Sequence, residues 1–214
     1  MPHRALKRGG ARNSRDRKSW QLSERDCLKL IGASEAAWAA GAPLSRFITL
    51  AWGKGGIEAS NAVQATGDFI KLAREWMKAR GHPMPWNWVQ ETGNRFGQHA
   101  HILLHVPQEL EPLFRVMPRR WAAHILGGKY VAGVLDCQRL ASAYSASTNP
   151  ALYQAILSGK LHYMLKTAPA ALESRLDMTN RGHKKWGQSC VVIGKRAAVW
   201  QGWKKQADVK DRPK

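Results

Sequence analysis

The chain has 214 residues, is 44% hydrophobic, and carries 34 Lys+Arg against 15 Asp+Glu, a formal charge of +19. This composition excludes a disordered or fibrous protein, and no apolar run approaches the roughly 18 residues of a membrane helix. No apolar run follows the basic first residues, which excludes a secretory signal. The three distant cysteines disfavour a disulfide framework or a zinc ribbon, and they fit a reducing cytoplasm. The charge predicts a polyanionic partner, most often a nucleic acid.

The ends of the chain differ in composition from its middle. Residues 1–19 are basic and aperiodic, which predicts a flexible arm or, equally well, a solvated tail without a specific role. We expect one folded domain over 20–200, followed by a basic tail over 201–214.

The first predicted elements are a helix, a strand and a second helix. Ser23 and Asp26 have the spacing of a weak capping box at the start of a helix over 23–40. Residues 47–52 are β-branched and aromatic, which predicts a buried strand. Helical spacing of apolar residues then extends over 57–80.

A β-hairpin is predicted next, from strands over 86–91 and 99–106 joined by a short glycine-containing loop. The elements expected after it are a helix over 109–125, a strand over 130–137, a helix over 149–166 and a strand over 189–193, followed by a basic helical end. Ser158-Gly159 is a possible bend in the helix over 149–166. The central hairpin argues against a parallel sheet and favours an α+β fold, with about five antiparallel strands and helices on one face.

Two histidines, His99 and His101, alternate within a predicted apolar strand. Successive strand residues point to opposite faces, so these two share one face, with Cα atoms about 6.6 Å apart. The pattern indicates either a metal site or two histidines that are satisfied or exposed on a sheet face. His105 has the same parity but lies about 13 Å further along the strand, too far for the same ion.

Glu91 is the nearest candidate for a third metal ligand. It ends the partner strand of the hairpin, and pairing would bring its carboxylate near His99 and His101. The alternative is a solvent-exposed strand end. Two imidazoles and one carboxylate with open positions suit Mn²⁺, or Mg²⁺ with water filling in, and Zn²⁺ is the competing assignment.

Tyr163 and Lys166 are three residues apart in a predicted helix and therefore lie on one face. A tyrosine hydroxyl becomes a usable nucleophile when a nearby cation favours its deprotonated form, and the same ammonium can neutralise charge on a phosphate. Taken alone, the pair also fits an amphipathic helix with an interfacial tyrosine and an outer lysine.

Together these groups resemble the HUH (histidine-hydrophobe-histidine) endonuclease superfamily of rolling-circle replication initiators, single-strand transposases and conjugative relaxases. The three motifs of the superfamily are matched by Phe47-Ile48-Thr49-Leu50, by His99-Ala100-His101-Ile102-Leu103-Leu104, and by Tyr163 with Lys166. Glu91 matches an upstream residue that often completes the metal site. The resemblance spans about 45–196, and Trp86 to Pro107 also looks like short replication-associated proteins of bacteria and their mobile elements.

Two features of the sequence resemble the replication initiators, which are one branch of the superfamily. The histidines precede the tyrosine, as in replication initiators and unlike relaxases, and Thr167 replaces the second tyrosine of the double-tyrosine pattern. No Gly-x-x-x-x-Gly-Lys-Ser/Thr loop for ATP is present, so unwinding would need a partner.

The resemblance implies a ferredoxin/RRM-like fold and a metal-dependent DNA endonuclease and strand transferase. Tyr163 would be the nucleophile, and Lys166 would stabilise charge. Glu91, His99 and His101 would hold Mn²⁺ or Mg²⁺. The expected partners are single-stranded DNA or a DNA hairpin at a plasmid or phage origin, with a host helicase and polymerase, in the cytoplasm of a bacterial host cell.

Basic residues near the predicted strands are candidates for contacts with the DNA backbone. They are Lys54, Arg95, Lys195 and Arg196. Trp86 and Trp88 share a strand face and can stack on unpaired bases, although core packing is the alternative. Two other functions stay open: a dimeric single-strand DNA transposase, and a non-catalytic DNA- or RNA-binding regulator.

Overall fold

The computed structural model describes residues 17–93, 96–140, 142–176 and 191–202. Most of the expected N-terminal arm and C-terminal tail therefore lies outside the described residues, as does Arg95. Lys18–Ser19, which we assigned to the arm, form a short strand, β1. The division into arm, domain and tail stays a prediction.

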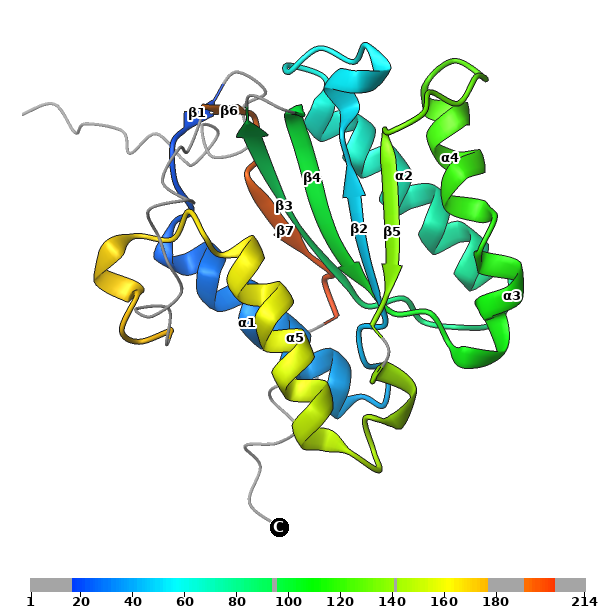
Figure 1. Cartoon of the computed structure of the whole chain (residues 1–214), viewed down its shortest axis with the longest axis vertical. Helices are drawn as coiled ribbons and strands as arrows, with labels where there is room; N and C mark the ends of the chain where they lie inside the picture. Colours follow the sequence, from blue (N-terminus) through cyan, green and yellow to red (C-terminus); the bar gives the residue numbers. More distant parts are fainter. Residues whose placement is uncertain (1–16, 94–95, 141, 177–190, 203–214) are drawn as a thin grey trace, which may run out of the picture.

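The main sheet has five antiparallel strands in the order β5-β2-β4-β3-β7 (Figure 1). Their bounds are Arg46–Leu50 for β2, Trp86–Gly93 for β3, Gly97–Leu104 for β4, Leu135–Arg139 for β5 and Ala197–Val199 for β7. The expected α+β class is confirmed by this antiparallel sheet and its helices. The expected hairpin is confirmed because β3 and β4, which are consecutive in the chain, pair with each other. The strand that carries the two histidines, β4, is the central one.

Helices cover both faces of the sheet, so the expectation of helices on one face is wrong. Helices α1 (Glu24–Ala39) and α5 (Pro150–Met164) lie on one face, and α2 (Ala62–Lys78), α3 (Glu111–Phe114) and α4 (Met117–Ile125) lie on the other (Figure 1). The physical reason is visible in β4, whose residues 98–104 are all buried. A strand buried on both sides needs a cover on both sides.

Each face of the sheet has its own hydrophobic core. Phe47, Val89 and Leu103 pack with α1 and α5. Ile48 and Ile102 belong to the core that includes α2 and α4. Because side chains alternate along a strand, His99 and His101 share the face of Leu103, toward α1 and α5.

Capping residues set the starts of the two helices on the histidine face. The Ser23 side chain accepts a hydrogen bond from the Asp26 backbone N–H, which confirms Ser23 as the N-cap of α1, and the Asp26 carboxylate accepts from the Ser23 hydroxyl. Asn149 caps α5 in the same way, and Pro150 occupies its first turn. The helix continues through Ser158-Gly159, where a bend was possible, and ends at Met164.

The single helix expected over 109–125 is three pieces: a 3-10 turn at Gln108–Leu110 (η3), then α3 and α4. Pro112 and Pro118 each stand in the first turn of a new helix, because proline has no N–H to continue the preceding one. Helix α2 begins at Ala62, later than expected, after the 3-10 turn η2 (Trp52–Gly55). None of the helices in the described ranges is long and apolar enough to cross a membrane.

The C-terminal part differs most from the sequence prediction. The strand expected over 189–193 is β6 (Val192–Ile193), which pairs with β1 in a separate two-stranded sheet. Helical structure was expected after it, but Ala197–Val199 form β7 and pair with β3 at the edge of the main sheet. Three small apolar residues form too short a run to be read as a strand without the neighbouring strand that pairs with them.

Candidate metal centre and its tyrosine

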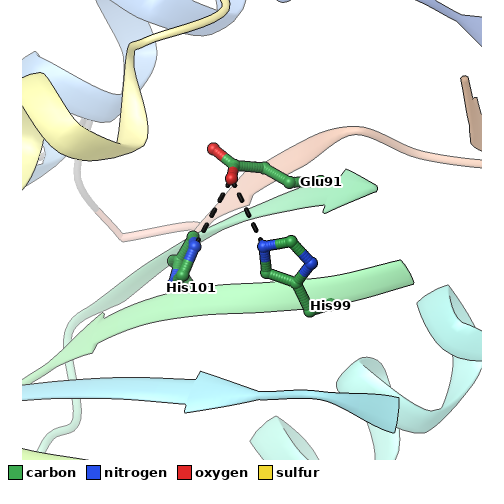
Figure 2. A group of neighbouring side chains, drawn as sticks. All are labelled: Glu91, His99 and His101. Atoms are coloured by element: carbon green, nitrogen blue, oxygen red, sulfur yellow. Dashed lines mark ion pairs between the residues drawn. The ribbon is translucent and has the colours of Figure 1, made fainter. Parts of the chain in front are cut away.

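The hairpin brings Glu91, His99 and His101 together on one face of the sheet. Glu91 pairs directly with His99, and His101 follows on the same face of β4. The Nε2 atoms of both histidines lie 3.4 Å from Oε2 of Glu91, and the ligand atoms of the three residues are within 4.8 Å of one another. Figure 2 shows the carboxylate reaching from β3 toward both rings. The three residues form a group that can hold a metal ion.

Hydrogen bonds on the outer side of each ring fix its orientation. His99 Nδ1 is 2.9 Å from the Gly97 carbonyl oxygen. A carbonyl oxygen only accepts, so Nδ1 donates to it, and Nε2 on the other side of the ring is the atom that faces Glu91. His101 Nδ1 lies 3.0 Å from the Thr49 hydroxyl on β2. Both rings are thus held with Nε2 toward Glu91, as metal-binding histidines commonly are.

The site also favours the protonation states that bind a cation. Burial by itself raises the pKa of Glu91, but its contacts with His101 and His99 and the charge of Lys166 outweigh burial and hold that pKa below its ordinary value. Burial lowers the pKa of His101, although Glu91 opposes the shift. A carboxylate beside two imidazole rings is a suitable donor set for a divalent metal ion.

A cation already contacts this donor set from within the chain. The Lys166 ammonium forms an ion pair with Oε2 of Glu91, the oxygen that both histidines face. Glu91 is only 3% exposed, and a buried carboxylate needs such compensation. The position therefore attracts positive charge, and the residues present fit a divalent ion.

Tyr163 lies directly beside the metal-binding group. Its ring centroid is 4.8 Å from that of His101 and 6.0 Å from that of Phe47, edge-on in both cases. The Lys166 ammonium lies 4.3 Å from the centroid of the Tyr163 ring. Tyr163 belongs to the last turn of α5, whereas Lys166 comes just after the helix ends. The turn that follows α5 carries Lys166, whose ammonium contacts both the Glu91 carboxylate and the Tyr163 ring.

The other basic residues expected to contact DNA are in different surroundings. Lys54 is exposed in η2 and lies 4.7 Å from the ring centroid of Phe96, which itself packs edge-on against His99. A Cβ at Gly53 would lie 3.1 Å from the Phe96 carbonyl oxygen, so glycine allows this close approach to the hairpin loop. Lys54 is therefore near the metal-binding group.

Residues 195 and 196 differ sharply. The Lys195 side chain is exposed overall, but neighbouring groups exclude part of the water around its ammonium. This desolvation, and to a smaller extent the charge of Lys29, lowers its pKa. Arg196 is only 6% exposed, and its guanidinium donates to the hydroxyl and the carbonyl of Ser19. This placement gives Arg196 a structural role in attaching β1 to the turn before β7.

The aromatic residues expected to stack on bases are mostly in the core. Trp88 is buried and Trp86 packs against the same core, on the α2 side of the sheet. His105, considered too distant for the metal, bonds to the Pro43 carbonyl oxygen. Of the eight tryptophans in the described ranges, only Trp20 is exposed, at 60%.

Three residues near the tyrosine received no role from the sequence. Thr49 was noted only as part of a motif, yet it bonds to His101. Lys160 and Gln138 bond to each other at 3.0 Å on the tyrosine side of the sheet. Lys160 precedes Tyr163 by one helical turn, which was a usable signal, whereas Gln138 shares this face only because β5 pairs with β2.

The family model of the replication-associated protein ORF2/G2P matches residues 45–147. Over these residues the chain is similar to replication-associated proteins. The matched segment contains the strands β2 to β5, and with them Glu91, His99 and His101, and it ends before Tyr163 and Lys166. A search of the curated proteins finds no match.

Proposed function

We propose that the protein nicks single-stranded DNA and rejoins it through a covalent link to Tyr163, and so initiates rolling-circle replication. The observation that carries the proposal is the contact between the Tyr163 ring and His101, at 4.8 Å between centroids. It brings a nucleophilic side chain to a group of metal ligands. The similarity to replication-associated proteins supports replication as the process.

Glu91, His99 and His101 hold the divalent ion in this proposal, with Mn²⁺ or Mg²⁺ favoured over Zn²⁺. A bound ion of this kind polarises a phosphate oxygen and stabilises the charge that develops during displacement at phosphorus. The Lys166 ammonium then has two partners close by, the Glu91 carboxylate and the Tyr163 ring. Its positive charge neutralises negative charge on the phosphate and on the phenol oxygen as that oxygen bonds to phosphorus.

The transfer step exchanges one phosphodiester linkage for another. The Tyr163 hydroxyl oxygen gives up its proton and bonds to phosphorus, the bond from phosphorus to the 3′ oxygen breaks, and the released 3′ oxygen takes up a proton. The products are a 5′-phosphotyrosine and a free 3′-hydroxyl that can prime a polymerase. A later attack by a 3′-hydroxyl on the phosphotyrosine rejoins the strand without ATP.

The positive charge of the chain supplies the affinity that is independent of sequence. Lys54 and Lys195 are both exposed, and Lys54 lies near the hairpin loop beside His99. Neutralising several phosphates makes binding fall steeply with salt concentration. A host helicase and polymerase are the partners that a nicked origin requires.

The test is incubation of the protein with a random pool of single-stranded DNA and Mn²⁺, followed by denaturing electrophoresis. We expect a protein–DNA adduct that survives boiling in detergent and whose sequencing gives the nick site. Tyr163→Phe should bind DNA yet form no adduct, because only the hydroxyl is removed. Tyr130→Phe, on the α4 side of the molecule, is the matched control. An adduct that persists in Tyr163→Phe would overturn the assignment of the nucleophile.

A further inference from the structure

Lys160 and Tyr163 lie one helical turn apart on α5 and contact the same residue of the sheet. The Lys160 ammonium is 4.6 Å from the centroid of the Phe47 ring, and the Tyr163 ring meets the same ring edge-on at 6.0 Å. Side chains three residues apart on a helix are neighbours, about 5–6 Å between Cβ atoms. The lysine is therefore fixed beside the phenol ring.

The sheet face is open next to Lys160. Strand β5 is an edge strand, and its residues Asp136 and Gln138, which share the face of Thr49 and Phe47, are both exposed. At the opposite edge of the sheet, α1 packs against β3 and β7. Figure 1 shows β5 at the edge of the sheet opposite to β7. An extended strand of nucleic acid can approach Tyr163 across this exposed edge.

The direct partner of Lys160 leaves its positive charge available. Lys160 donates to the side-chain carbonyl oxygen of Gln138 at 3.0 Å, and the amide nitrogen of Gln138 donates to Asp136 at 2.7 Å. An amide is neutral, so it orients the ammonium without cancelling its charge. A phosphate is a stronger partner for an ammonium than an amide, because both groups are then charged.

We propose that Lys160, oriented by Gln138, binds the phosphate next to the one that Tyr163 attacks, and so sets the register of the strand in the site. The ligand is a phosphodiester of an unpaired strand, and the inference rests on the proposed nicking function. Lys160 is a positioning residue, because it contacts a phosphate that does not react. The separation of Lys160 and Tyr163 by one helical turn suits neighbouring phosphates of an extended strand.

The test measures binding of single-stranded DNA in a Tyr163→Phe background, in which no adduct forms. Lys160→Ala should weaken binding about tenfold at low salt and reduce the slope of log K against log[salt] by about 0.7. Lys160→Arg should retain most of the affinity. Lys71→Ala, which removes an exposed lysine from α2 on the opposite face, is the control. An unchanged affinity and slope in both Lys160→Ala and Lys160→Gln would overturn the inference.

Register is tested by neutralising single phosphates. A set of DNA strands carries one neutral methylphosphonate each, at successive positions around the nick site. The protein that retains Lys160 should bind more weakly to the strand whose methylphosphonate is next to the nick site. The Lys160→Ala protein should bind that strand as well as the unmodified one. Equal sensitivity of both proteins at every position would overturn the register role even though nicking stands. If no strand forms an adduct but the Lys160 effects on poly(dT) binding persist, the nicking function fails while the phosphate contact holds.

Discussion

At the scale of single residues, the hydrogen bond between the Thr49 hydroxyl and His101 Nδ1 orients one ring of the metal-binding group. It joins β2 to β4 and holds the ring with Nε2 toward Glu91. Glu91, His99 and His101 could be chosen as candidate metal ligands from the sequence, because strand alternation and hairpin pairing depend on residues close together in the chain. Thr49 and Gln138 could not, since their contacts depend on which strands lie side by side in the sheet.

We expect Thr49→Val to weaken Mn²⁺ binding by about tenfold, because the isosteric side chain cannot bond to His101 Nδ1. Thr49→Ser should keep the affinity near that of the unmodified protein. Isothermal titration calorimetry measures both, and Thr148→Val, at an exposed threonine, is the control. Equal affinities for Thr49→Val and the unmodified protein would show that the hydroxyl does not orient the ring.

Trp20 lies at the surface, and the residues on either side of it, Ser19 and Leu22, form hydrogen bonds with residues close to Glu91 and Lys166. Ser19 accepts from Arg196, whose charge acts on Glu91, and the Leu22 backbone N–H donates to the Thr167 carbonyl, next to Lys166. An exposed indole beside basic residues suits stacking on an unpaired base, worth about 1–3 kcal/mol.

We therefore expect Trp20→Ala to weaken binding of single-stranded DNA at least fivefold, a loss of about 1 kcal/mol. Trp20→Phe should restore most of the affinity, because a smaller aromatic ring can still stack. Fluorescence anisotropy with a labelled strand gives the dissociation constants. Leu113→Ala removes a similarly exposed apolar side chain from α3 and should have no effect. A matching loss in that control would assign the effect to stability rather than to stacking.

At the scale of elements, local signals predicted the hairpin and the capped helices, and tertiary packing decided the rest. Ser23 and Asn149 are real caps because capping depends on the adjacent turn alone. The division of helices between two faces depends on the burial of β4 on both sides, which a run of mixed residues does not reveal. Strand β7 forms only because β3 offers it an unpaired edge.

Polar side chains attach helix α3 to β2, beside the hydrophobic core that includes α2 and α4. Glu111 forms an ion pair with Arg46 and accepts a hydrogen bond from the Tyr144 hydroxyl. Burial lowers the pKa of Arg46 from its ordinary value, because the guanidinium is partly removed from water. Removal of one member of such a pair leaves an uncompensated charge in a mostly buried position.

Glu111→Ala should therefore lower the free energy of unfolding by about 3 kcal/mol, measured by urea denaturation. Glu109→Ala, at an exposed carboxylate one turn earlier, should change it by less than about 0.5 kcal/mol. A small effect of Glu111→Ala would mean that water reaches Arg46 and replaces the carboxylate.

At the scale of the whole molecule, an ion held by Glu91, His99 and His101 would stabilise the fold as it binds. The ligands come from two strands, and a ligand that binds only the folded chain stabilises it. Millimolar Mn²⁺ should raise the free energy of unfolding by about 2.7 kcal/mol if the ion is present at one hundred times its dissociation constant.

The measurement is thermal unfolding with and without Mn²⁺. His101→Ala should abolish the increase in melting temperature, because one of three ligands is lost. His124→Ala, on α4 and away from the group, should leave the increase intact. No response of the unmodified protein would favour a DNA- or RNA-binding regulator that needs no metal.

The positions of the site residues along the chain also bear on the order of assembly. Glu91 and His99 belong to a hairpin with a short loop, so little entropy is lost in bringing them together. Tyr163 reaches the same place from α5, about sixty residues further on, and closes a far longer loop. During synthesis the ion ligands emerge and pair first. Under the proposed nicking function, the site of a nascent chain would therefore be complete only when α5 docks against the sheet.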